Sequence, residues 1–357
     1  MDEPRNRMYV NMDRPTGKKP MPKRPTKRQK AMRVLVITFC VLIVALIGCG
    51  ILLYVNISQI WGDLGNGSGE LAILEPDDNV EGLPEVTYAE GDVSEIAKMQ
   101  GETDIMLIGV DNRAKEFTGR SDVMMYLRVN SEKKTIKLVS FMRDTLVKIE
   151  GHEKNKLNTA FFFGSTELMY KTYYSNFGLK PDYYMVVNFY GMEDILDSLG
   201  GVDISVEKEE LEWLNININE INTEDPRGKV SGINKSGDQH LNGRQAVAYM
   251  RIRHPGYDSG RIARQQAVLK ELFNEMRNVN VGEIPGILGA LTQYVRTDMP
   301  LGTMIDLATA VRGMESSSLE TFRYPEKYKE GNYNGSSVVQ PEDFATEFGK
   351  LNDFLEN

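Results

Sequence analysis

Seven arginines and three aspartates are concentrated in four short segments of a 357-residue chain that is otherwise acidic, with a formal net charge of -9. The segments are Asp111–Arg113, Arg120–Asp122, Arg143 and Arg251–Arg264. A guanidinium group presents forked hydrogen-bond donors that match the oxygens of a phosphate. Aspartates beside such arginines favour a hard divalent cation that is shared with the phosphate. The pattern therefore predicts phosphoryl chemistry.

Two of the aspartates stand at the ends of expected β-strands. Asp111 follows the apolar segment Asp104–Val110, and Asp122 opens the segment Asp122–Val129. If these strands are antiparallel neighbours, the two carboxylates meet at one edge of the sheet, where they repel each other unless a cation lies between them. Mg²⁺ or Mn²⁺ would accept both carboxylate and phosphate oxygens. Taken alone, each segment is explained equally well by surface Asp–Arg salt bridges.

Three further arginines lie near expected strand or helix ends. Arg143 follows the expected strand Thr135–Phe141 and could bind a phosphate with Asp144 holding it, although a structural Arg–Asp bridge is the simpler reading of this pair alone. If their segment is extended, Arg251 and Arg253 point to one face. Two like charges on one face need solvent or an anion.

A helix is expected from about Arg261 onward, preceded by Asp258, Ser259 and Gly260. Arg261 and Gln265 then share one helix face. A helix N-terminus also attracts anions through its free backbone N–H groups. This stretch is the most specific signal for an anion site in the chain.

The N-terminal region has the pattern of a membrane anchor. Val34–Val55 is a run of 22 residues without a charge, which is long enough to cross a bilayer as a helix. Residues 1–33 carry 11 Lys/Arg against 3 Asp/Glu, which predicts a disordered tail on the cytoplasmic side. Residues 56–100 are expected to form a stalk, and residues 101–357 a folded domain outside the cytoplasm.

The composition of the exported part excludes several classes of site and partner. It holds 31 basic and 48 acidic residues, a formal charge of -17, which argues against a nucleic-acid partner. Both cysteines, Cys40 and Cys49, lie in the apolar run, so a disulfide or a thiol nucleophile is not expected outside. The three histidines show no metal-ligand spacing, which argues against zinc.

Periodicity predicts a single α/β domain, a sandwich with helices on both faces of a mixed sheet. Besides the three strands above, the expected strands are Tyr183–Phe189, Gly201–Val206 and Leu319–Tyr324. The expected helices are Asn158–Phe177, Gly191–Leu199, Gln245–Arg253, one from Arg261, two near 282–296 and 301–313, and one from Pro341. The polar stretch 207–240 is expected to hold loops, with room for a hairpin.

Six motifs occur in an order that resembles the LytR-CpsA-Psr family, together with one N-terminal span. They are GVDNR, GRSD, VSFMRDT, VVNFYGM with DSLGGVDI, LNGRQAVAYMRIRH and DSGRIARQQ, within about residues 102–280. Jointly they are specific, although each alone is weak. The resemblance implies a membrane-anchored phosphotransferase that moves a glycopolymer from an undecaprenyl-pyrophosphate carrier onto peptidoglycan through a phosphodiester.

The resemblance also implies roles for single residues. Asp111 and Asp122 would hold Mg²⁺, and Asp258 could act as general base for the incoming sugar hydroxyl. The pyrophosphate would be bound by Arg113, Arg120, Arg143, Arg251, Arg253, Arg261 and Gln265. Arg143, Asp258 and Arg261 are the catalytic candidates, because the transition state of phosphoryl transfer spreads charge over oxygens that arginines stabilise.

The lipid tail of such a carrier needs an apolar slot. The candidates to line it, all on one expected helix, are Phe161, Phe162, Phe163, Met169 and Tyr173. Ordinary core packing is the commoner role for any one of them.

Two other functions use the same features. A hydrolase of polyprenyl pyrophosphates would need the same site with water as acceptor. A membrane-bound regulator of the cell envelope would bind the lipid without turnover, although the tail is too short to fold as a DNA-binding domain. The sequence leaves the polymer open, with teichoic acid and capsule both compatible.

Overall fold

The computed structural model describes residues 83–88, 91–110, 117, 119–254, 257–280, 282–291 and 295–357. Chain contacts divide the molecule into Met1–Ala72 and Ile73–Asn357, and every described residue belongs to the second unit. None of the described helices combines the length and the apolarity that a bilayer span requires. The predicted tail, the predicted span and the stalk as far as residue 82 lie outside the described residues.

A six-stranded mixed sheet forms the centre of this unit, in the order β10-β3-β2-β1-β6-β9. The strands are β1 (Glu102–Val110), β2 (Ser121–Asn130), β3 (Thr135–Phe141), β6 (Tyr183–Asn188), β9 (Val295–Thr297) and β10 (Leu319–Tyr324). Strand β2 runs antiparallel to both of its neighbours, β1 and β3, while β6 is parallel to β1 and β10 is parallel to β3. Val110 pairs with Ser121, so the end of β1 and the start of β2 lie at the same edge.

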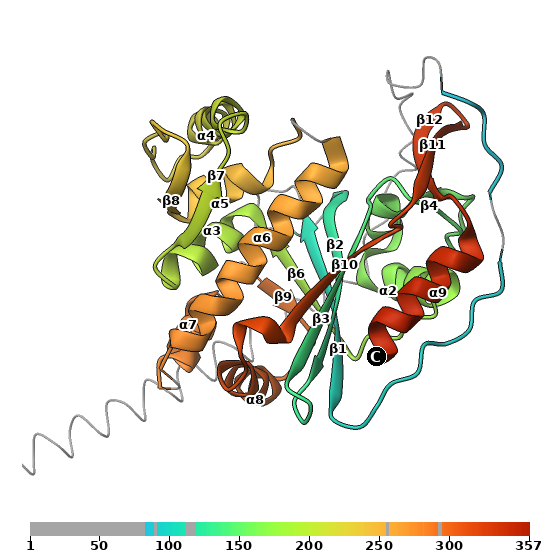
Figure 1. The fold of residues 1–357 in the computed structure, drawn as a ribbon, viewed down its shortest axis with the longest axis horizontal. Helices are drawn as coiled ribbons and strands as arrows, with labels where there is room; N and C mark the ends of the chain where they lie inside the picture. Colours follow the sequence, from blue (N-terminus) through green and yellow to red (C-terminus); the bar gives the residue numbers. More distant parts are fainter. Residues whose placement is uncertain are drawn as a thin grey trace, which may run out of the picture. The chain divides into compact units, whose positions relative to one another are not determined.

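Helices cover both faces of the sheet, as the sequence predicted (Figure 1). One face packs against α2 (Leu157–Phe177) and α9 (Phe344–Glu356), and the other lies under α6 (Tyr257–Asn278), with α7 (Ile284–Leu291) and α8 (Leu301–Arg312) beyond it. The alternation of strand side chains explains the two layers. On β2, Tyr126 packs in the core with α2, whereas Val129 packs with Phe273 of α6.

A second core lies among the elements between β6 and α6. It joins α3 (Phe189–Ser198), β7 (Val202–Val206), α4 (Leu211–Glu224), β8 (Gly237–Leu241) and α5 (Gly243–Met250). The prediction of loops over 207–240 was wrong for α4. Alternating Asn and Ile hide its helical pattern, but Leu214, Ile218 and Ile221 follow helical spacing and are buried against α5.

Several other element boundaries differ from the sequence-based expectation. The helix expected over 282–296 ends at Leu291, and β9 begins at Val295. The C-terminal helix begins at Phe344 instead of Pro341, because β12 (Ser336–Pro341) pairs with β11 (Tyr328–Tyr333) in a hairpin that was not expected. Two short strands, β4 (Leu146–Val147) and β5 (Asn155–Lys156), connect β3 to α2.

Residues 83–88 and 91–100, which the sequence assigned to the stalk, pack on the folded unit. The Val86 N–H donates to the carbonyl of Asn332 at 2.9 Å, and Ile96 is buried in the main core. The folded part therefore begins before residue 101.

Candidate functional site

Three elements bring the central residues of the candidate site together at one edge of the sheet. Asp122 is the second residue of β2, and Arg143 lies two residues after the end of β3. The antiparallel pairing of β1 with β2 fulfils the condition under which Asp111 and Asp122 share an edge, but Asp111 and Arg113 themselves lie outside the described residues.

Arg143 lies at the centre of a group of carboxylates. Its Nη1 donates to Asp122 Oδ1 at 2.7 Å, and its Nε donates to Asp144 Oδ2 at 3.3 Å. Asp258 Oδ2 lies 3.5 Å from the same Nε. Asp144 also pairs with Lys156, with Nζ 3.4 Å from Oδ1. The sequence analysis did not single out Lys156 as a site residue. Its position depends on the β4–β5 pair, which returns the chain to the end of β3 just before α2 begins.

Helix α6 contributes the second arginine. It begins at Tyr257, earlier than expected, so Asp258 lies in its first turn. Arg261 Nη2 is 3.2 Å from Asp258 Oδ1, and its Nη1 is 3.7 Å from Asp122 Oδ1. We call Asp122, Arg143, Asp258 and Arg261 the arginine–aspartate cluster.

Opposing charges shift the pKa values inside this cluster. Burial alone would raise the pKa of the Asp122 carboxyl, but the charges of Arg143 and Arg261 lower it below its usual value. Burial would lower the pKa of Arg143, and the surrounding carboxylates raise it instead. The pKa of Arg261 is lowered, first by burial and then by the positive charge of Arg143. Arg261 is therefore a buried cation that gains from an added negative charge.

Two atoms of the cluster are buried without a hydrogen-bond partner. They are Nε of Arg261, whose residue is 4% exposed, and Oδ2 of Asp258. An unpaired buried donor on a charged group is costly unless a ligand or water satisfies it. The arrangement can therefore accept an anion at Arg261 and a donor or a cation at Asp258.

The two arginines that follow α5 were expected to share one face if their segment is extended, and this condition is not met at Arg251. Arg251 keeps near-helical dihedrals, φ -90° and ψ -9°, so the segment is not extended at this point. Its Nη2 is 3.0 Å from Glu220 of α4. Arg253 is exposed, and its charge contributes to the lowered pKa values of both Asp122 and Arg261. The charge of Arg253 therefore acts on the cluster, whereas Arg251 pairs with α4.

Other candidates have different surroundings. Arg120 is exposed and directly precedes Ser121, the first residue of β2. Gln265 is 4% exposed, about one turn along α6 from Arg261. Arg264 is buried, with Nε 2.6 Å from Glu210 Oε1 and Nη1 donating to the carbonyl of Ile252 at 2.9 Å. Arg264 thus fixes the backbone between Arg251 and Arg253.

The five lipid-slot candidates lie in three different environments. Phe161, Met169 and Tyr173 are buried in the main core, whereas Phe162 is 41% exposed. Phe163 stacks on His152, with ring centroids 4.2 Å apart. A break in α2 at Gly164 and Ser165, where Ser165 has φ 54°, separates the first three from the last two. A shared lipid slot stays a prediction.

The oxygen donors of the cluster fit a hard divalent cation. Asp258 Oδ2 is buried without a hydrogen bond, and Asp122 has one oxygen engaged by Arg143. Carboxylate oxygens of this kind suit Mg²⁺ better than softer metals. Within the described ranges no three His, Cys, Asp or Glu side chains gather into a metal-binding group. The cation therefore stays a prediction that depends on Asp111 and on phosphate oxygens.

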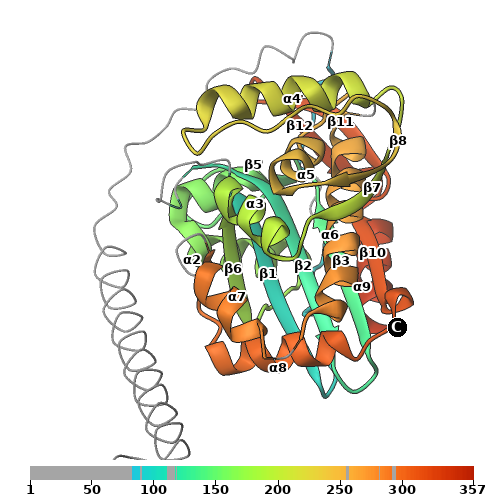
Figure 2. The same ribbon diagram turned by 90° about the vertical axis from the view of Figure 1, so that its left-hand side faces the viewer.

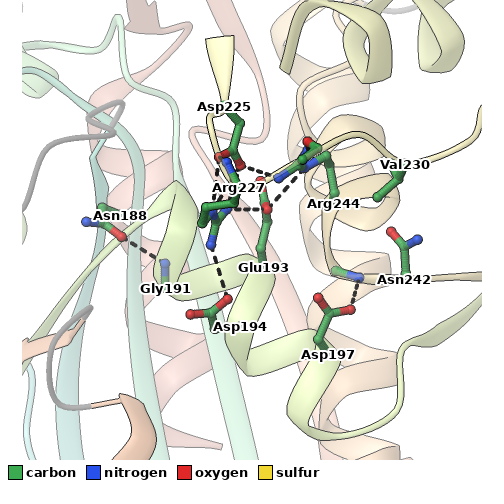
Figure 3. Close-up of polar contacts among 12 residues, drawn as sticks. Asn188, Gly191, Glu193, Asp194, Asp197, Asp225, Arg227, Val230, Asn242 and Arg244 are labelled. Carbon is green, nitrogen blue, oxygen red and sulfur yellow. Dashed lines mark hydrogen bonds and ion pairs between the residues drawn. The ribbon is translucent and has the colours of Figure 1, made fainter. Parts of the chain in front are cut away.

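A second charged cluster, which the sequence analysis did not single out, supports α5 (Figure 3). Arg244 of α5 pairs with Asp225 and with Glu193 of α3, and Arg227 pairs with the same two carboxylates. Asp225 and Arg244 are both nearly inaccessible to solvent. This cluster joins α3 and the residues after α4 to the N-terminal end of α5, the helix that leads into Arg251.

Comparison with known proteins gives consistent matches over the same part of the chain. The model of the LytR_cpsA_psr family matches residues 76–348. The chain is 32% identical over 265 residues to the regulatory protein MsrR of Staphylococcus aureus. This alignment covers 72% of this chain and 76% of MsrR. It is 32% identical over 209 residues to the polyisoprenyl-teichoic acid–peptidoglycan teichoic acid transferase TagU of Bacillus anthracis, covering 57% of this chain and 62% of that protein. The crystal structure of TagV from B. subtilis superposes with a TM-score of 0.58 at 26% identity, over 72% of this chain and 97% of that one.

Proposed function

Because the chain belongs to the LytR-CpsA-Psr family, we propose that it is a membrane-anchored phosphotransferase that moves a glycopolymer from an undecaprenyl-pyrophosphate carrier onto peptidoglycan. The name of TagU, a teichoic acid transferase to peptidoglycan, supports this class of reaction. The apolar run Val34–Val55 and the basic tail before it support an anchor with the domain outside the cytoplasm.

The observation that carries the proposal is the unpaired Nε on the buried guanidinium of Arg261, whose other two nitrogens face Asp122 and Asp258. Its Nε has no partner, and its pKa is lowered by burial and by Arg143. Both conditions are relieved by an anion that approaches Arg261 and Arg143 together. A diphosphate carries enough oxygens to accept hydrogen bonds from both guanidinium groups at once, whereas a carboxylate has only two oxygens.

The proposed reaction is a displacement at phosphorus. The oxygen of a peptidoglycan sugar hydroxyl forms a bond to the phosphorus that carries the glycan. The bond from that phosphorus to the bridging oxygen breaks, and polyprenyl phosphate leaves with the electron pair. The hydroxyl proton moves to a carboxylate, for which Asp258 is our candidate because its buried Oδ2 accepts no hydrogen bond and lies 3.5 Å from Arg143 Nε.

Arg143 and Arg261 are positioned to stabilise the charge that develops in this step. They lie on two separate elements and contact the same carboxylate oxygen, Asp122 Oδ1. Donors held rigidly before the reaction stabilise a transition state without reorganisation. When bound by Asp111 and Asp122, Mg²⁺ would neutralise phosphate charge.

A regulator that binds the carrier without turnover is the second candidate, because the relative MsrR is called a regulatory protein. Hydrolysis of the carrier, with water in place of the sugar hydroxyl, is the third. The cluster combines fixed cations with an available carboxylate, and turnover requires both whereas binding requires only the cations. This combination favours an enzyme.

One assay distinguishes the three functions. The full chain in detergent would be given a lipid-diphosphate glycan, Mg²⁺ and peptidoglycan oligomers. Glycan on the peptidoglycan supports transfer, phosphorylated glycan released into solution indicates hydrolysis, and bound but unchanged lipid indicates a regulator.

We expect Arg143→Ala and Asp122→Ala to lower transfer by about a hundredfold or more, since each removes a group at the reacting phosphates. Arg312→Ala, in the exposed last turn of α8, is the matched control and should transfer normally. Full activity in both cluster variants would remove the cluster from the active site.

A further inference from the structure

Helix α4 exposes a large aromatic side chain beside the arginine segment. Trp213 is 40% exposed and Ile216 is 46% exposed, and residues three apart in a helix share a face. Buried Leu214 and Ile218 hold the opposite face of α4 in the second core. Trp213 and Ile216 together form a small exposed apolar face on α4.

Two contacts join this face of α4 to the residues of the candidate site. Glu220 pairs with Arg251 at 3.0 Å, and the ring of Trp213 lies 5.1 Å from the ring of His254. Arg253, which lies between Arg251 and His254 in the sequence, lowers the pKa of Asp122 in the cluster through its positive charge. Figure 2 shows α4 across the end of the molecule where β1 and β2 meet, with α5 beneath it and α8 at the opposite end.

The chemistry of this face suits a neutral, amphipathic ligand. Flat aromatic faces pack against the C–H faces of sugar rings, and exposed carboxylates accept hydrogen bonds from hydroxyl groups. Glu212 and Glu220, both exposed, flank Trp213 and Ile216 on α4. The charge of Glu220 is offset by Arg251, and the Glu212 carboxylate repels phosphate and the surface of an anionic bilayer.

We infer that Trp213 forms a stacking platform for a sugar ring of the glycan, next to the diphosphate held by the arginine–aspartate cluster. The inference rests on the proposed function, because it places the sugar that is linked to the diphosphate. Trp213 contacts His254, which directly follows Arg253 in the chain, and the charge of Arg253 acts on Asp122 of the cluster. A second copy of the chain is a poorer occupant, because two exposed side chains offer far less area than the roughly 800 Å² per partner of a stable interface.

The test uses two probes that differ in the sugar and in the charge of the phosphate that the sugar esterifies, so each variant is compared with the unaltered chain on the same probe. Binding of farnesyl diphosphate and of farnesyl-diphosphate-linked N-acetylglucosamine to the full chain would be measured by calorimetry. We expect Trp213→Ala to weaken binding of the sugar-bearing probe about three- to tenfold, the range of one aromatic contact, and to leave farnesyl diphosphate unaffected. Trp213→Phe should keep most of the affinity. Leu301→Ala, which removes an equally exposed side chain from α8, should change neither probe.

Each outcome decides between the two claims. If Trp213→Ala binds both probes as the unaltered chain does, or weakens both equally, the sugar platform is refuted while the diphosphate site stands. If the unaltered chain binds neither probe, the proposed function fails and the inference with it.

A membrane role for this face gives a different signal. In a Trp61→Phe background, Trp213 is the only tryptophan, because the chain has 2. A shift of its emission on adding phosphatidylglycerol–phosphatidylcholine vesicles without probe would assign the face to the bilayer and overturn the inference.

Discussion

Arg251 and Arg253 differ in surroundings although a single residue separates them. Arg251 pairs with Glu220, and its guanidinium lies 5.0 Å from the ring of Phe189. Arg253 has its electrostatic effect on Asp122 and Arg261. The two residues are therefore expected to contribute unequally to binding of a diphosphate.

We expect Arg253→Ala to weaken farnesyl diphosphate binding about 10- to 100-fold, the range of a hydrogen bond to a charged group. Arg251→Ala should cost no more than about fivefold, because it removes a partly exposed ion pair worth at most about 1 kcal/mol. Titration of both variants at one salt concentration measures the difference. Equal losses would show that both side chains reach the ligand and that the contact with Glu220 gives way on binding.

The residue types of the cluster were predictable from sequence, and some of their partners were not. Arg143 and Asp122 follow from their places at strand ends, since neighbouring strand ends meet at a sheet edge. Lys156 depends on how β4 and β5 return the chain, and Arg251 depends on the helix α4. Neither is encoded in the local sequence around the site.

At the scale of elements, adjacent turns of α6 have two roles: they supply residues of the cluster, and they hold the backbone that precedes Arg253. Its first turns carry Asp258 and Arg261, and Arg264 then holds the carbonyl of Ile252 and the carboxylate of Glu210. Arg264 and Glu210 are both nearly buried, at 6% and 5% exposure. By binding the Ile252 carbonyl, Arg264 fixes the backbone directly before Arg253.

This separation predicts different effects on stability and on activity. Arg264→Met leaves the Glu210 carboxylate buried and unpaired, and should lower the free energy of unfolding by about 3–5 kcal/mol. Adding Glu210→Gln replaces the carboxylate that has lost its cation by a neutral amide, and should restore most of the free energy of unfolding. Activity should stay at least about tenfold low in the double variant, because the bond to the Ile252 carbonyl is still missing. Urea unfolding and the transfer assay measure the two quantities, and recovery of both together would reduce Arg264 to a purely structural role.

The elements differ in how well the sequence predicts them. Strands β1 to β3 and helix α2 have long periodic patterns, and their predicted bounds agree with the structure to within two residues. Helix α4 was missed because its Asn–Ile alternation mimics a strand, and β9 was missed because tertiary pairing with β6 determines it. Both lie in regions where contacts distant in sequence outweigh local propensity.

At the scale of the whole molecule, the buried arginines at the two ends of the central sheet differ in how completely their N–H groups are hydrogen-bonded. Toward the end away from the cluster, Arg128 is 2% exposed and its donors are satisfied. Its Nε and Nη2 donate to Asp104 at 2.8 Å, and its Nη1 donates to the carbonyl of Ala97 at 2.9 Å. Arg261 is buried almost as deeply, yet its Nε lacks a partner. Arg277 and Arg296 also have a buried Nε without a hydrogen bond, so the property that sets Arg261 apart is its contact with Asp122 and Asp258 in the proposed diphosphate site.

The most direct measurement of this claim is the affinity of the full chain for farnesyl diphosphate, compared between the unaltered chain, Arg143→Ala and Arg312→Ala. We predict saturable binding that weakens as salt increases, because the contact is electrostatic. The Arg143→Ala variant should bind about tenfold more weakly or worse, and Arg312→Ala should bind normally. Equal affinity in all three proteins would contradict the account, because the diphosphate would then bind somewhere other than the arginine–aspartate cluster.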